Sequence, residues 1–318
     1  MTMKRVYLDQ RDWITLAREH YGVTSDPAIA DVLAMVREAA SHGHASFPLS
    51  SGHYIETYRH GDPGRRQRLG RFMAEVSRFH TIAPAPSLLR DEVHVAVHDI
   101  VGLAPVRCPT PFGRGHAHAF GRQATYLADD EPVKRAVAQY GVEATFDYFE
   151  TAMIAGPDDR LPVDGIALPS LEFAQRQVDF EEETARRLSE WGHTSDRAHR
   201  LVLTQESPDA LDYLVEESSS LGIDPRSVFH SEPSATAFML ALPAKGTVCR
   251  LRMTAHEDQQ FRWHVHDLTD ITALGTAAAY CDIVVAEKRW GSILRRHARH
   301  TRATVTSNLR DLPRLLLQ

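Results

Sequence analysis

The two ends of the chain carry apolar runs of strand length, and this feature limits the possible fold more than any other. One run is Arg5-Val-Tyr-Leu-Asp9 and the other is Ile283-Val-Val-Ala286. A continuous apolar run is typical of a strand in a parallel sheet that is covered on both faces. Parallel strands need crossover connections, which are usually helices. The chain ends therefore predict one α/β domain with a central parallel sheet.

Residue patterns near both ends add further elements to this domain. After the first strand, spacing and capping residues predict helices around Trp13 and over 27–41, a strand over 45–49, and a helix that begins after Ser50 or Ser51. Toward the C-terminus, they predict a helix over 267–281, a strand over 283–286, a helix around Trp290, a strand over 303–306 and a closing helix over 309–317.

The middle of the chain differs in character from its ends. Residues 84–255 are mostly helical by pattern, and we expect helices near 87–102, 131–155, 169–192, 195–204, 207–221 and 231–242. We interpret this stretch as a helical insertion or a second domain. Residues 1–83 and 256–318 would then form the α/β domain together.

Composition indicates a globular protein in a reducing compartment. Of the 318 residues, 43% are hydrophobic and 25% are charged, which is ordinary for a soluble domain. The three cysteines are scattered without a CxxC spacing, so we expect no disulfide framework. The first residues lack the apolar core of a signal peptide, and no apolar run has the length that spans a bilayer. We expect a cytoplasmic protein that does not enter a membrane.

Basic residues cluster in two runs although the net charge is −6. One run lies between Lys288 and Arg302, and the other lies between Arg65 and Arg78. The first run follows Glu287 and the second follows Glu56, and both acids are candidate metal ligands. Such runs are either solvated helix faces or contacts for a nucleic-acid backbone.

Four carboxylates are expected at one edge of the sheet. Asp9 and Glu287 follow predicted strands, Asp270 lies in the first turn of a helix, and Glu56 lies early in the helix after the second strand. Ligands of open α/β sheets bind at the carboxyl ends of the strands. Converging acids repel one another unless a cation neutralises them, and oxygen ligands select Mg²⁺ or Mn²⁺. Such a metal activates water for attack on phosphodiesters.

Three segments with these acids resemble the PIN-like nucleases: VYLDQRDWITLA, FPLSSGHYIE and a late DxxxLxxAxxYCDIVVAEKRW pattern. The resemblance implies a three-layer α/β/α sandwich whose acidic pocket binds Mg²⁺ or Mn²⁺ and cleaves RNA, or DNA flaps in some branches. It covers the two chain ends only, so 1–83 and 256–318 would be the PIN-like domain. The positions that match the acids of the family are Asp9, Glu56, Asp270 and Glu287.

The chain departs from the family pattern in two places. Val285-Ala286-Glu287 stands where the family usually has Thr-x-Asp, which puts metal preference and activity in doubt. The long central stretch is absent from the minimal fold.

Two further acids have alternative interpretations. Asp267 is either a helix cap or a metal ligand. Asp282 begins a strand at the end opposite Glu287, but Tyr-Cys-Asp recurs in the PIN-like relatives that the chain resembles, so it stays a candidate ligand.

Polar residues beside the acids are candidates for binding substrate: Gln10, Ser50, Arg289, Arg295 and Arg296. The pairs His116/His118 and His264/His266 invite a zinc interpretation, but no CxxC or HExxH accompanies them, so we do not expect zinc there.

These features favour a metal-dependent endoribonuclease that hydrolyses RNA through a carboxylate-bound metal and activated water. We expect RNA, in single-stranded form, as the partner, and a homodimer is one assembly left open. The alternatives are a catalytically weakened PIN-like scaffold that binds RNA or protein, and a DNA structure-specific nuclease.

Overall fold

A four-stranded parallel sheet joins the two ends of the chain. The computed structural model describes residues 3–122, 131–156 and 171–318. The strands lie in the order β2 (Ala45–Ser46), β1 (Lys4–Leu8), β5 (Ile283–Val285) and β6 (Thr304–Thr306). Every pairing between neighbours is parallel, and Leu8 lies opposite Val285. The predicted α/β class with a parallel sheet built from both ends is confirmed.

The helices of the N-terminal part form largely where capping and spacing place them. They are α1 (Gln10–His20), α2 (Pro27–Ser41), α3 (Ser51–Tyr58) and α4 (Pro63–Ser77). Asp26 caps α2 by accepting the backbone N–H of Ala28, and Pro27 occupies the first turn, where its missing N–H costs nothing. Asp62 caps α4 in the same way.

In the C-terminal part, helices alternate with the strands β5 and β6. It contains α14 (Asp267–Tyr280), β5, α15 (Lys288–Arg296), the short 3₁₀ turns η2 (Ala298–His300) and η3 (Leu309–Asp311), β6 and α16 (Leu312–Leu317). The predicted closing helix therefore begins as a 3₁₀ turn.

The sheet is buried on both faces. Val6 and Leu8 of β1 face a core that includes Trp13, Val36 and Phe72 of α1, α2 and α4. Tyr7 faces the opposite way, into a core with residues of α13, α14 and α15. Side chains of a strand alternate between its faces, so apolar residues at successive positions require a cover on each side. This arrangement explains why the end runs are continuous.

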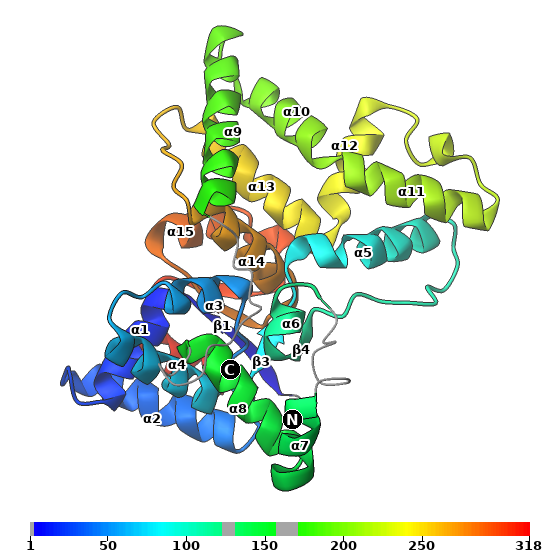
Figure 1. Cartoon of the computed structure of the whole chain (residues 1–318). Coiled ribbons are helices and arrows are strands. Elements are labelled where there is room, and N and C mark those ends of the chain that lie inside the picture. The colour runs from blue at the N-terminus through cyan, green and yellow to red at the C-terminus, as the bar shows by residue number, and fades with distance from the viewer. Residues whose placement is uncertain (1–2, 123–130, 157–170) are drawn as a thin grey trace.

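The predicted insertion at 84–255 divides between two parts of the molecule (Figure 1). In one part, β4 (Phe112–Arg114) pairs antiparallel with β3 (His80–Ile82), and α6 (Gly115–Ala119), α7 (Glu131–Tyr140) and α8 (Val142–Ala155) follow. Met153 and Ile154 of α8 belong to the same core as Val6. These helices therefore pack on the α/β part.

The remaining helices form the second group, at the top of Figure 1. They are α5 (Ala85–Ile100), α9 (Leu171–Glu190), α10 (Ser195–Glu206), α11 (Pro208–Leu221), α12 (Glu232–Ala241) and α13 (Pro243–Glu257), with a 3₁₀ turn η1 (Pro225–Ser227). A separate core holds α5, α11, α12 and α13 together and includes Val93, Leu214 and Phe238. α13 also packs on α14 and thereby joins this group to the sheet.

Several local predictions differ from the structure. The helix expected over 131–155 is broken at Gly141, whose φ of 85° is not helical. The strand expected over 45–49 is regular only to Ser46, and Leu49 makes an isolated bridge to Thr81. The first two residues of the helix expected over 169–192 lie outside the described residues.

The cysteines are unpaired, as expected: Cys108 is exposed, and Cys249 and Cys281 are buried. No helix within the described ranges combines the length and the apolar character needed to cross a membrane.

Candidate functional site

Asp9 and Glu287 meet at the carboxyl edge of the two central strands. Asp9 directly follows β1 and is the N-cap of α1, where its Oδ1 accepts the backbone N–H of Arg11 at 3.1 Å. Its other oxygen, Oδ2, accepts the backbone N–H of Glu287 at 3.3 Å. The Asp9 carboxylate is thus held by two backbone donors, and the same contact fixes where the chain leaves β5.

Glu56 reaches this edge from α3 in an unfavourable environment for its charge. Burial raises the pKa of Glu56 to about 7, and the nearby charges of Asp9 and Glu287 act in the same direction, against a smaller opposing effect of Arg59. No hydrogen bond contributes to this shift. A carboxyl with so high a pKa is half protonated near neutral pH unless a cation stabilises its charged form.

Asp270, in the first turn of α14, completes the group of four. Burial raises its pKa well above the ordinary value, and the charges of Glu56, Asp9, Glu287 and Asp267 raise it further. Within the described part of the chain, its carboxylate makes no hydrogen bond or ion pair. The four acids that the sequence placed at one edge therefore act on one another in the folded chain.

The pKa of Glu287 is raised by burial and by Asp9, against the charge of Arg289. Among described residues, however, no three of the four acids bring their oxygens within 4.8 Å of one another. The four acids converge at one edge of the sheet, but their oxygens are spaced more widely than the ligands around one metal ion.

Asp267 lies beside the cluster but has partners of its own. It is the first residue of α14, after the N-cap position of His266, so the predicted capping role is displaced by one residue. Its Oδ2 accepts the backbone N–H of His264 at 2.7 Å, and its Oδ1 pairs with Arg289 at 3.3 Å. Asp267 is therefore an ion-paired neighbour of Asp270.

Asp282 is not brought to the cluster, which corrects its placement among the candidate ligands. It lies just before β5, whereas Glu287 lies beyond the other end of that strand. Its Oδ2 accepts the backbone N–H of Arg5 at 2.8 Å, and its Oδ1 pairs with Arg302 at 2.8 Å. Its carboxylate ties the N-terminal ends of two strands together.

The candidate substrate residues next to the first strands are buried. Gln10 is 8% exposed and donates to Thr57 Oγ1 at 3.0 Å. Ser50 is 3% exposed, and its backbone N–H donates to His53 Nδ1 at 2.9 Å. Burial lowers the pKa of His53 to about 3, so this ring is neutral and supports the start of α3. Both Gln10 and Ser50 position the helices that carry the acids.

The arginines predicted to contact substrate have different surroundings. Arg289 stacks on Phe261 with 3.5 Å between its guanidinium carbon and the ring centroid, and it donates to the carbonyl oxygen of Arg262. Arg295 donates to Ser307 Oγ at 3.0 Å, and Arg296 is exposed. Arg289 is the one of the three that also contacts an acid next to the cluster.

A pocket of about 160 Å³ opens beside Glu56. Glu56 of α3 lines it together with Arg59, which directly follows this helix, and with His266, Thr269 and Gln177. An acid of the cluster and a basic side chain therefore line the same pocket.

Asp12 is a fifth acid near the cluster that the sequence analysis did not select. It is 2% exposed, and burial raises its pKa to about 7. The charge of Arg11 lowers this pKa, whereas the charge of Asp9 raises it. Its Oδ2 has no hydrogen-bond partner among the described residues. The DQRD spacing, which puts an acid in the first helical turn three residues after Asp9, was the available signal.

The two histidine pairs considered for zinc lie apart from such a site. His116 pairs with the buried Glu150, and His118 Nδ1 lies 2.9 Å from Thr81 Oγ1. Neither pair belongs to a group of three metal-type ligands in the described part of the chain.

Comparisons with known proteins identify no relative. No protein-family model matches the chain, and no curated protein or solved structure matches it significantly.

Proposed function

We propose that this protein is a divalent-metal-dependent ribonuclease of the PIN-like type, with a three-layer α/β/α arrangement of the sheet and its covering helices. One observation carries the proposal: Asp9, Glu56, Asp270 and Glu287 converge at the carboxyl edge of the sheet, and the charges within this group raise the pKa values of Glu56, Asp270 and Glu287. Holding four acids at one edge costs repulsion, and a bound cation reduces it.

The ligand chemistry fits Mg²⁺ or Mn²⁺, because all four side chains offer oxygen. When bound, such an ion lowers the pKa of a coordinated water and stabilises negative charge on a phosphate. The chain's own part is to orient this group. Asp9 is fixed by two backbone N–H donors, and Asp267 pairs with Arg289 beside the cluster.

A basic groove supports RNA as the substrate. Arg18, Arg65 and Arg68 line a hollow of about 370 Å³ together with Tyr21 and His60. Ile14, which also lines it, is five residues along α1 from Asp9, or about 7 Å at the helical rise. Guanidinium groups with an aromatic ring are typical of surfaces that bind a single strand.

The test is cleavage of end-labelled single-stranded RNA with Mn²⁺. We expect activity in the wild type and its loss in the Asp9→Asn, Glu287→Gln double variant. Asp282→Asn is the matched control, because it changes an acid next to the same strand at the opposite end. Equal cleavage by the wild type and the double variant would contradict the proposal.

A scaffold without catalysis is the second candidate, since Glu287 stands where the PIN-like pattern has an aspartate. Calorimetric titration with Mn²⁺ separates the two, because a scaffold needs no metal affinity. Competition between RNA and flap DNA tests the choice of substrate. The cytoplasmic location and the homodimer stay predictions.

A further inference from the structure

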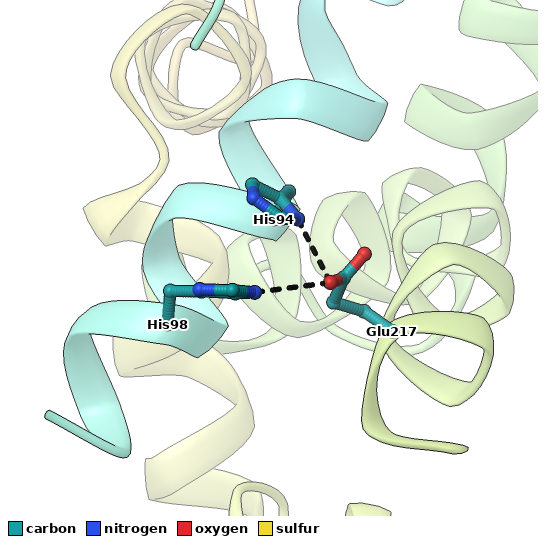
Figure 2. Close-up of side chains that lie close together, drawn as sticks. All are labelled: His94, His98 and Glu217. Carbon is teal, nitrogen blue, oxygen red and sulfur yellow. Dashed lines mark hydrogen bonds and ion pairs between the residues drawn. The ribbon is translucent and has the colours of Figure 1, made fainter. Parts of the chain in front are cut away.

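Two helices far from the acid cluster bring a second set of metal-type ligands together. His94 and His98 lie one turn apart on α5, and Glu217 lies on α11. Figure 2 shows both imidazole rings turned toward the Glu217 carboxylate. His94 Nδ1 and His98 Nε2 lie 2.8 and 3.2 Å from the same oxygen, Oε1. Among the residues the structure describes, this is the one group of three such side chains with ligand atoms within 4.8 Å of one another.

The hydrogen bonds of His98 leave a nitrogen lone pair that faces a carboxylate. His98 Nδ1 lies 3.1 Å from the carbonyl oxygen of Ala104, which can only accept, so Nδ1 carries a proton. In the neutral ring, Nε2 is then an acceptor, and it faces Oε1 of Glu217, another acceptor. This contact is favourable only if Nε2 takes a second proton or if the two atoms share a cation. A histidine whose other N–H donates to a backbone carbonyl is the usual metal-binding arrangement.

His94 is available after one local change. Its Nε2 accepts the backbone N–H of Val106 at 3.1 Å, so its proton lies on Nδ1 and is donated to Glu217. Coordination through Nδ1 moves this proton to Nε2, and the N–H of Val106 must turn away. Val106 is 86% exposed in the loop between α5 and β4, so its N–H can turn to water, and the change costs the hydrogen bond that His94 Nε2 accepts.

The surroundings hold the three side chains in place. The side chains of His94, His98 and Glu217 are 3%, 6% and 11% exposed. Arg107 donates to Glu217 Oε2 at 3.0 Å, which orients the carboxylate and leaves Oε1 toward the histidines. Arg107 also pairs with Asp91 at 3.1 Å, so its charge is shared. Two imidazoles and one carboxylate in a buried place are a ligand set that Zn²⁺ prefers.

We propose that His94 Nδ1, His98 Nε2 and Glu217 Oε1 bind a transition-metal ion of the Zn²⁺ class, which ties α11 to α5. The site is independent of the acid cluster and of the proposed nuclease function. Coordination requires His98 Nε2 without a proton, and the proton of His94 moves from Nδ1 to Nε2. Three protein ligands leave one position of a tetrahedral ion for water.

The test is calorimetric titration with Zn²⁺ in a background that carries Glu56→Gln and Asp270→Asn, so that the acid cluster does not compete. We expect one tightly bound equivalent and a rise in Tm with Zn²⁺. His98→Gln and Glu217→Gln should each weaken binding by at least about 100-fold, because even the loss of an outer partner costs about 10- to 100-fold.

His256→Gln is the matched control. His256 is equally buried and lies 2.7 Å from a carboxylate, that of Glu181, but it has no second histidine beside that acid. It should bind Zn²⁺ as the background does. The proposal is overturned if the background protein binds no Zn²⁺, or if His98→Gln and Glu217→Gln bind it unchanged. Should these variants fail to fold, Co²⁺ bound to the background protein decides: an intense four-coordinate visible spectrum supports the site, and a weak octahedral one overturns it.

Discussion

The backbone N–H of Glu287 donates to Oδ2 of Asp9, across 278 residues of sequence. This bond joins the loop after β5 to the first residue after β1, and the two acids therefore come to the same edge of the sheet. Because Asp9 also accepts from Arg11, the start of α1 and the exit of β5 share one anchor.

Replacing Glu56 with glutamine should stabilise the metal-free protein at pH 7 and remove cleavage of RNA. At pH 7 about half of the Glu56 side chains carry a charge against the effects of burial, Asp9 and Glu287, and the amide has no charge to repel. We expect a higher Tm in chelating buffer together with lost Mn²⁺-dependent activity. Thermal melts and cleavage assays check both. A lower Tm for Glu56→Gln would show that its charge is already compensated.

The metal-free protein should lose stability as the pH rises from about 4.5 to about 7. The folded pKa of Glu56 is about 7 against 4.5 for the free side chain, so the folded state holds a proton that the unfolded state has lost in this window. Stability from this group is fully present below pH 4.5 and is lost as the pH passes 7. Its size is about 2 to 3 kcal/mol.

The same sign applies to Asp12, whose pKa is raised from 3.8 to about 7. Urea unfolding at a series of pH values measures the slope, and Glu56→Gln should reduce it. Saturating Mn²⁺ should reduce it as well, because the ion favours the charged carboxylates. A flat profile in the chelated wild type would contradict the assignment of the pKa shifts.

The contact between α4 and α8 should be sensitive to a single methyl group. A Cβ added at Gly70 would lie 2.6 Å from the Cα of Ala155, and backbone atoms cannot yield easily. Gly70→Ala should therefore destabilise the protein by about 1 to 3 kcal/mol. Gly64→Ala, in the first turn of the same helix, meets nothing closer than 3.4 Å and should be neutral or slightly stabilising. Chemical denaturation of both variants tests the difference.

The groove lined by Arg65 and Arg68 should contribute to RNA affinity through charge. If each contacts one phosphate, their joint replacement by glutamine lowers the slope of log affinity against log salt by about 1.4 for a single strand. The control replaces Arg186 and Arg187 of α9, which are also exposed and do not line this groove. Fluorescence anisotropy at several salt concentrations gives both slopes. Equal slopes would place the RNA elsewhere.

The sequence predicted the sheet because its inner strands are continuous apolar runs. The sheet is buried on both faces at Val6-Tyr-Leu8 and Ile283-Val-Val285. Burial on both faces requires apolar residues at successive positions, and this pattern can be recognised from the local sequence alone. The positions of Asp9 and Glu287 could be predicted from the same apolar runs, because each acid directly follows one of them. The sequence also indicated that Asp282 lies away from the other acids, because it precedes the strand that Glu287 follows.

Other features depend on contacts between distant segments and had no local signal. β3 and β4 are three residues each, and only their pairing makes them strands. Glu217 lies more than a hundred residues after His94 and His98, and no motif joins it to them. The split of the predicted insertion follows from Met153 and Ile154, which pack into the core around Val6. Apolar spacing identifies a buried face but does not identify what buries it.

The pairing of β1 with β5 has a consequence for protein synthesis. Val6 pairs with Ile283, so the ribosome must add 277 residues before the first strand meets its inner neighbour. At usual rates of translation this takes about 14 to 55 s. During that time Asp9 has no Glu287 beside it, and an incomplete chain carries only part of the acid cluster. For the proposed ribonuclease, this delay would keep a half-made enzyme from cutting the message that encodes it.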